Sequence, residues 1–202
     1  DRANPGRGQT GGEAVVTFAL SAADTRRLLQ DSAAAYRTHV NDLLLTALAQ
    51  VLARWTGADR VTIALEGHGR EELGDAPEIA RTVGWFTTLY PVALSLEGAV
   101  GDGDAIKQIK EQLRAVPRRG LGYGLLRYLG EEATQARLAA RREPELCFNY
   151  LGQVDAGAAE GRKEGFAPAG ESRGADHGAT NPRAFLIEVN AVVAGGELRC
   201  AW

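Results

Sequence analysis

Short apolar runs, several of them alternating with polar residues, predict β-strands in this chain. These runs cover 13–20, 60–65, 92–96 and 145–151. Apolar residues spaced three or four positions apart predict helices at about 21–32, 40–55, 106–113 and 125–142. Two further apolar runs flank the pair Gly195-Gly196 and predict a β-hairpin from 183–193 and 197–202. Strands separated by helices, with a hairpin at the end, predict an α/β fold in which helices pack on a mixed sheet.

The helix predicted at 40–55 has the clearest pattern. Its apolar stripe consists of Val40, Leu43, Leu44, Ala47, Leu48, Val51, Leu52 and Trp55. We expect Thr38 to cap its N-terminus and Gly57 to end it. Upstream, Ser21 and Asp24 have the spacing of a capping box and predict the start of the preceding helix.

Two segments lack the large apolar residues that an ordered core needs. Residues 1–12 are rich in glycine and proline and are expected to be a linker. Residues 154–182 are rich in glycine, alanine and charged residues, and we expect a long irregular excursion there.

The strand predicted at 60–65 ends in candidate chemistry. Its alternation places Val61, Ile63 and Leu65 on one face and puts Glu66 on the opposite face. A carboxylate at a strand end, followed by Gly67 and Gly69, can act as a base toward a substrate. The alternative is a surface turn with scattered charges.

Three further runs attract attention. In Arg81-Thr-Val-Gly-Trp-Phe-Thr87, Trp85 and Phe86 predict an apolar wall or, alternatively, a pair that fills the core. Pro117-Arg-Arg-Gly-Leu-Gly-Tyr-Gly124 lacks the spacing of nucleotide-binding glycine loops. In Phe148-Asn-Tyr-Leu-Gly152, Asn149 and Tyr150 lie on opposite strand faces, so at most one of them points into a given cleft.

Composition excludes several classes of function. The chain has 202 residues, 45% of them hydrophobic, which is enough for one α/β domain. A formal charge of −3 argues against nucleic acid or an anionic membrane as a partner. No apolar run approaches a transmembrane span, and the polar start does not resemble a signal peptide, so we expect a cytoplasmic protein.

The histidines and cysteines predict no metal site. The three histidines are too scattered to form a zinc set. His68, between two glycines, either contacts a substrate or hydrogen-bonds to a neighbour. Cys147 and Cys200 lie in apolar strand-like runs, which favours buried free thiols over a disulfide.

Taken together, these runs resemble the signature motifs of epimerization domains of nonribosomal peptide synthetases, which are relatives of condensation domains. The motifs occur in order as Glu66-Gly-His-Gly-Arg-Glu71, Arg81-Thr-Val-Gly-Trp-Phe-Thr87 with Tyr90-Pro91, Pro117 through Gly124, and Phe148-Asn-Tyr-Leu-Gly152. Asn41-Asp-Leu-Leu-Leu-Thr-Ala47 resembles the helix motif that precedes them. The resemblance covers 13–202, nearly the whole chain.

The resemblance implies one lobe of a two-lobe, chloramphenicol-acetyltransferase-like fold. The His-His-x-x-x-Asp motif of that family lies in the N-terminal lobe, and this chain has no adjacent histidines. The chain therefore resembles the C-terminal lobe alone. By the same resemblance, the excursion at 154–182 is a candidate for the segment that latches onto the N-terminal lobe; a plain surface loop is the alternative.

The chemistry implied by the resemblance is inversion of the α-carbon of an aminoacyl or peptidyl thioester. Glu66 matches the motif carboxylate and would be one acid/base partner; a histidine of the N-terminal lobe would be the other. Arg70 would fix Glu66 or the neighbouring loop. Tyr150 and Asn149 match the last motif, and Tyr150 is preferred for its size and hydroxyl reach.

His68, Trp85 and Thr87 complete the set expected to position the substrate or the loop. The implied partners are the N-terminal lobe and a peptidyl carrier protein, whose 4'-phosphopantetheine arm delivers the substrate, so no metal or directly bound cofactor is expected. The isolated lobe is expected to be inactive. A lobe of an amide-forming condensation domain and a non-catalytic scaffold of the same fold remain alternatives.

Overall fold

A computed structural model of the chain describes residues 10–71, 74, 78–154, 171–172, 174–175 and 177–202. Most of the predicted linker at 1–12 and of the predicted excursion at 154–182 lies outside these residues. The candidate latch therefore remains a prediction. Within the described residues, every helix is too short or too polar to serve as a membrane span.

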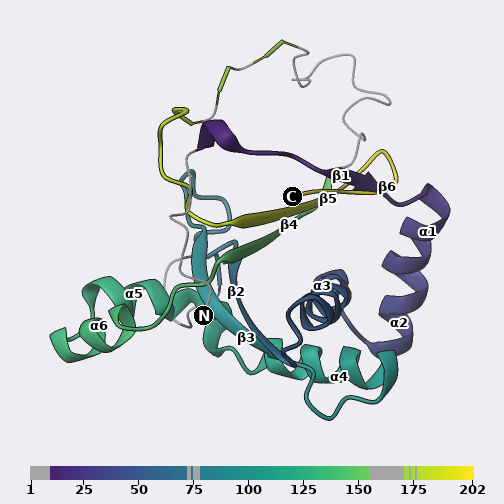
Figure 1. Cartoon of the computed structure of the whole chain (residues 1–202), viewed down its shortest axis with the longest axis horizontal. Helices are drawn as coiled ribbons and strands as arrows, with labels where there is room; N and C mark the ends of the chain where they lie inside the picture. Colours follow the sequence, from purple (N-terminus) through teal and green to yellow (C-terminus); the bar gives the residue numbers. More distant parts are fainter. Residues whose placement is uncertain (1–9, 72–73, 75–77, 155–170, 173, 176) are drawn as a thin grey trace.

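The described strands form a mixed sheet in the order β1-β6-β5-β4-β2-β3 (Figure 1). Their bounds are Thr17–Ala19 (β1), Arg60–Gly67 (β2), Thr88–Ser95 (β3), Leu146–Val154 (β4), Ile187–Ala194 (β5) and Glu197–Ala201 (β6). β4 runs parallel to both β2 and β5, and the other neighbouring strands are antiparallel. The predicted α/β fold with helices on a mixed sheet is confirmed.

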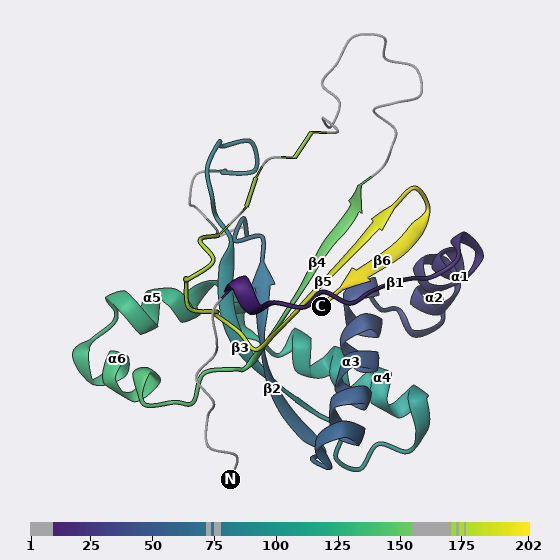
Figure 2. The ribbon, with the colours of Figure 1, turned by 45° about the horizontal axis from the view of Figure 1, so that its top comes forward.

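The helices divide into two groups, which lie on opposite sides of β2 and β3 (Figure 2). The first comprises α1 (Ala22–Arg26), α2 (Ala33–Tyr36), α3 (Val40–Thr56) and α4 (Gly101–Arg114), and a π-helical turn, Arg27–Ser32, joins α1 to α2. The second comprises α5 (Leu121–Leu129) and α6 (Glu132–Ala139), which lie beside β3 (Figure 1). The Ser21 side chain accepts the Asp24 N–H at 3.1 Å, as the capping-box spacing predicted.

The main core lies between one face of the sheet and helices α3 and α4. It is built from Leu45, Ala49, Leu52, Ile63, Leu65, Val92, Leu94, Ile109, Leu146 and Phe148. Val61, Ile63 and Leu65 face this core, which confirms the predicted alternation in β2. A second cluster joins β5 and β6 to Leu20, to the π-helical turn at Leu28 and Leu29, and to Leu44 of α3. We call the side that α3 and α4 cover the helix face, and the other side the open face.

Several predicted boundaries were wrong. β3 begins four residues before the predicted run at 92–96, and β5 begins four residues after the predicted start at 183. His39, rather than Thr38, is the N-cap of α3, and its N–H donates to the Asp42 carboxylate at 2.9 Å. The helix predicted at 125–142 is two short helices, because Gly130 adopts an extended conformation between them. The strand predicted at 13–20 is regular only over Thr17–Ala19, where it pairs with the edge of β6.

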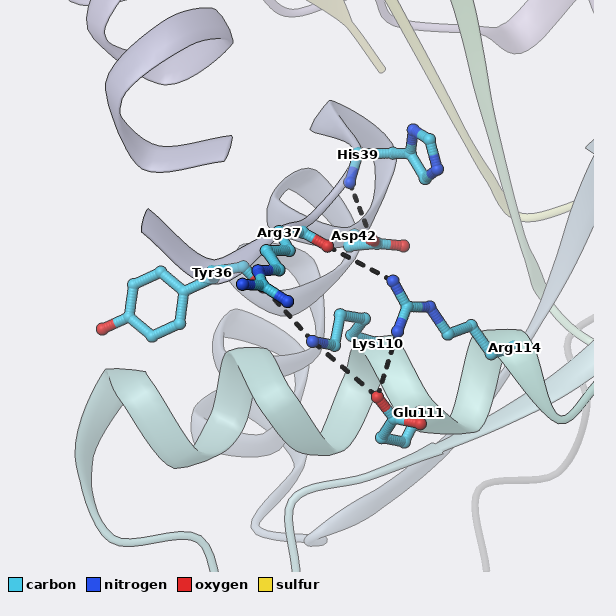
Figure 3. A network of polar contacts seen from close by, with 7 residues as sticks. All are labelled: Tyr36, Arg37, His39, Asp42, Lys110, Glu111 and Arg114. Carbon is cyan, nitrogen blue, oxygen red and sulfur yellow. Dashed lines mark hydrogen bonds and ion pairs between the residues drawn. The ribbon is translucent and has the colours of Figure 1, made fainter. Parts of the chain in front are cut away.

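Side chains of α4 hydrogen-bond to the segment that joins α2 to α3 (Figure 3). The Lys110 ammonium donates to the Tyr36 carbonyl at 3.2 Å, and the Arg114 guanidinium donates to the Arg37 carbonyl at 3.2 Å. Both cations also contact the Glu111 carboxylate, at 3.7 and 3.3 Å. These contacts hold the start of α3, whose first turn borders the candidate site.

Candidate functional site

The candidate site lies where strands β2 and β4 separate. The two strands pair at Ala64–Cys147 and Leu65–Phe148. Beyond these pairs a cavity of about 400 Å³ opens. It is lined by Asn41, Leu65, Glu66, Gly67, His68, Glu71, Thr87, Tyr90, Arg119, Phe148, Asn149, Tyr150 and Leu151. The structure thus brings Glu66, His68, Thr87, Asn149 and Tyr150 together, as the sequence motifs suggested.

Glu66 lies on the open face, as the alternation of β2 predicted. The sheet register sets Leu89 of β3 opposite Glu66. Desolvation by the surrounding residues and, second, the negative charge of Glu188 on β5 raise the pKa of Glu66 above its usual value. A carboxyl group with a raised pKa is well suited to both taking up and returning a proton.

The strand register places Asn149, and not Tyr150, on the same face of the sheet as Glu66. Ala64 pairs with Cys147, so the residues two positions further on, Glu66 and Asn149, share the open face. The Tyr150 ring packs against both apolar clusters on the helix face, and burial raises the pKa of its hydroxyl. The preference for Tyr150 on size therefore overlooked its side of the sheet, although Tyr150 does line the end of the cavity.

Arg70 holds the loop that connects β2 to β3. Its guanidinium donates to the carbonyls of Ile79 and, at 3.1 Å, of Gly84, and it stacks over the Phe86 ring at 4.3 Å. The sequence left two partners open for Arg70, Glu66 and the neighbouring loop, and the structure shows its contacts to the loop. Gly69 allows this close approach, because a Cβ atom built there would lie 1.6 Å from the Phe86 carbonyl oxygen.

His68 also makes contacts within its own motif. Its Nδ1 atom accepts the Arg70 N–H at 3.0 Å, and its Nε2 atom lies 3.1 Å from the Glu71 carboxylate. With Nδ1 acting as an acceptor, the ring proton resides on Nε2 and is donated to Glu71. These contacts hold the imidazole ring in place. They match the second of the two interpretations of His68, a hydrogen bond to a neighbouring residue.

Glu71, Arg119 and Tyr90 lie within the sequence motifs, but the sequence alone assigned them no role in the site. The Glu71 carboxylate lies 3.8 Å from the Arg119 guanidinium. Burial raises the pKa of the Tyr90 hydroxyl, and so does the charge of Glu71, whereas Arg119 lowers it. Arg119 belongs to the Pro117–Gly120 turn, where it and Arg118 adopt left-handed backbone conformations. The Pro-Arg-Arg-Gly run was the available signal, but only the fold places it beside Glu71.

Trp85 and Thr87 have different surroundings. Trp85 is 90% exposed, so it does not fill the core, whereas Phe86 is half-buried under Arg70. Thr87 lines the Glu66 cavity. The aromatic pair therefore separates into one anchored ring and one ring that projects into solvent.

The two cysteines are buried free thiols, as predicted. Cys147 lies on the open face between β2 and β5. In the described part of the chain, no cluster of three or more His, Cys, Asp or Glu side chains is placed to hold a metal ion.

Comparison with known proteins defines the class to which this fold and site belong. The model of the condensation domain family matches residues 2–201, and the chain therefore belongs to that family. It is 50% identical over 188 residues to a linear gramicidin synthase protein from Brevibacillus parabrevis, in a match that covers 93% of this chain and 2% of that protein. It is 49% identical over 189 residues to chondramide synthase cmdD from Chondromyces crocatus, covering 94% of this chain and 5% of that protein.

Among solved structures, the chain resembles the epimerization domain from the third module of tyrocidine synthetase B. The two superpose with a TM-score of 0.83 at 39% identity, over 96% of this chain and 42% of that one. The first condensation domain of the CDA synthetase shares the fold, with a TM-score of 0.55 at 18% identity over 93% and 38% of the two chains. The chain thus spans less than half of these domains and a small part of the synthases.

Proposed function

We propose that this chain is the C-terminal lobe of an epimerization domain in a nonribosomal peptide synthetase. The observation that carries this proposal is the position of Glu66, within the motif Glu-Gly-His-Gly-Arg-Glu, at the mouth of the cavity between β2 and β4. The likeness to the tyrocidine epimerization domain supports it. The complete domain would act as an isomerase that converts L to D residues during peptide antibiotic synthesis.

In the proposed reaction, the Glu66 carboxylate removes the α-proton of an aminoacyl or peptidyl thioester. The electron pair of the broken C–H bond moves into an enolate, and an acid on the opposite side of the α-carbon returns a proton. In the reverse direction Glu66, now protonated, is the acid. The raised pKa of Glu66 suits both tasks. It brings the pKa closer to neutral pH, where the ionised form can accept a proton and the protonated form can donate one.

The other site residues support Glu66 in this proposal. Asn149 lies on the same face and carries an amide N–H that can stabilise the enolate oxygen. Tyr150 lines the cavity from the helix face. Arg70 and His68 hold the loop that brings Thr87 to the cavity rim. Trp85, exposed on the same loop, is proposed to contact the substrate arm or the partner lobe.

The proposed mechanism requires two partners. The opposing acid/base group would come from the N-terminal lobe, and the thioester would arrive on the 4'-phosphopantetheine arm of a peptidyl carrier protein. With Glu66 as one half of a two-group mechanism, this lobe alone should be inactive.

Chiral analysis of an aminoacyl carrier protein tests the proposal. The carrier is incubated with this chain, with a separately produced N-terminal lobe, and with both, and the aminoacyl group is then released and resolved into enantiomers. We expect inversion only when both lobes are present. Inversion by this chain alone would contradict the two-lobe mechanism. Amide formation with a second aminoacyl carrier, without inversion, would instead identify a condensation lobe.

A further inference from the structure

A second cavity lies on the open face, between the sheet and α5. It measures about 550 Å³. Ala64 of β2, Leu89 and Pro91 of β3, and Leu121, Leu125 and Tyr128 of α5 contribute to its walls. Figure 1 shows α5 beside β3, and the two elements contact each other.

This second cavity adjoins Glu66 along the strands. Leu89 is the register partner of Glu66, and Ala64 precedes Glu66 by two residues on the same face. Two residues of a strand span about 7 Å, so Ala64, in the wall of the second cavity, is the next residue along β2 on the same face as Glu66. Thr87 and Tyr90 line both cavities, so the two cavities adjoin each other at the start of β3.

The chemistry on the two sides of Glu66 differs sharply. Toward β4 and β5 lie Asn149 and the carboxylate of Glu188. Toward α5 lie mostly aliphatic and aromatic side chains, together with two of opposite charge, Arg127 and Glu143. The guanidinium of Arg127 on that side stacks over the Tyr128 ring at 5.1 Å. An apolar group near Glu66 is therefore favoured on the α5 side, whereas an anionic group is repelled by Glu188 on the other.

We propose that the α5 cavity receives the side chain of the residue whose α-carbon lies at Glu66, and that it selects aliphatic and aromatic side chains. This inference rests on the proposed function of Glu66. It gives α5 a specificity role: the helix faces the side chain of the substrate, while β2 and β4 face its reacting α-carbon.

Two glycines of α5 provide a matched pair of variants. Gly124 lines the cavity, and a Cβ atom built there meets nothing within 4 Å. Gly122 has equally open space but does not line the cavity. Both are helical, so Gly124→Phe and Gly122→Phe change helix propensity alike. Only Gly124→Phe should fill the space meant for the substrate.

The experiment measures epimerization of alanyl, leucyl and phenylalanyl carrier proteins by the complete two-lobe domain that carries each variant. We expect Gly124→Phe to lower the phenylalanyl-to-alanyl ratio of kcat/KM at least about tenfold, because a lost apolar contact is typically worth 10–200-fold in discrimination. The ratio in Gly122→Phe should match that of the parent domain. Gly124→Lys should shift the preference toward glutamyl carriers, which checks the assignment if the phenylalanine variant does not fold.

Each result decides a different point. An unchanged ratio in Gly124→Phe and no gain for glutamyl carriers in Gly124→Lys would overturn the inference and indicate that another segment of the domain fills the cavity. If the parent domain inverts no aminoacyl carrier, the proposed function itself fails, and this inference fails with it.

Discussion

Glu66 and Glu188 lie on the same face of the sheet, on strands separated only by β4. Cys147 of β4 stands in register with Glu188 and with Ala64, two residues before Glu66. Burial first, and then the charges of Glu66 and Glu188, raise the pKa of the Cys147 thiol to about 12. The thiol therefore stays protonated at neutral pH and is a poor nucleophile.

Removing the charge of Glu188 should shift the pH dependence of epimerization. In Glu188→Gln, one of the two causes that raise the pKa of Glu66 is lost, so this pKa should fall. One direction of the reaction requires ionised Glu66, and the reverse direction requires protonated Glu66. The limb of each pH–rate profile that reports this ionisation should move to lower pH. The measurement is kcat/KM against pH for each enantiomer in the complete domain.

The other groups that face Glu66 set the control for this profile. Cys147 shares the open face with Glu66, and the titratable residues His68, Glu71, Tyr90, Arg119 and Tyr150 line the same cavity. Glu197→Gln, at the start of β6 and paired with Arg199 at 3.2 Å, removes a carboxylate away from the cavity and should leave the profile in place. Identical shifts in both variants would mean that Glu188 acts only through net charge.

Replacing Glu66 with glutamine should abolish most of the activity of the complete domain. The amide keeps the size of the side chain but cannot take up the α-proton, and general acid–base catalysis typically contributes about 10²–10⁴-fold. We expect a fall in kcat of that order with an unchanged urea midpoint. Parent-like rates in Glu66→Gln would assign Glu66 a structural role.

Asn149 and Tyr150 should respond differently to substitution. Asn149→Ala removes an amide on the face of Glu66, and loss of one such donor typically costs about 10²–10³-fold in kcat. Tyr150→Phe keeps the ring that packs in the core and should change kcat much less. Single-turnover rates of α-proton exchange in deuterated water measure the difference. A larger loss in Tyr150→Phe would restore Tyr150 as the polar contact to substrate.

Gly69→Ala should loosen the loop between β2 and β3. Gly69 has a φ of 66°, and its Cβ position meets the Phe86 carbonyl, so the variant adds a clash to backbone strain. Gly98 has a φ of 74° with open space around it, and Gly98→Ala adds strain alone. Left-handed strain is worth about 1–2 kcal/mol. Urea denaturation of the two variants should show the larger loss in Gly69→Ala, and equal losses would mean that the loop simply moves aside.

Local sequence determined much of this structure. The alternation in β2 fixes which side chains reach the core, because strand side chains point to opposite faces in turn, and Glu66 was placed correctly from that pattern alone. The spacing of apolar residues and the left-handed Gly57 predicted the extent of α3, because helical periodicity and a glycine stop are both local properties. The predicted buried stripe was partly wrong: Leu45 and Ala49 lie in the core, whereas Val51 and Trp55 are exposed, because the sheet and α4 decide which side of the helix is covered. The ordered motifs identified the family.

Tertiary structure decided what depends on register and long-range packing. Which of Asn149 and Tyr150 joins Glu66 follows from the pairing of β4 with β2, and no local pattern encodes that register. Arg70 could serve a carboxylate or a loop, and only the folded path of 79–86 places carbonyl groups within its reach. Glu188 is distant in sequence, yet it reaches the site because β5 pairs with β4. Sequence periodicity sets the face of each side chain, whereas strand order sets its neighbours.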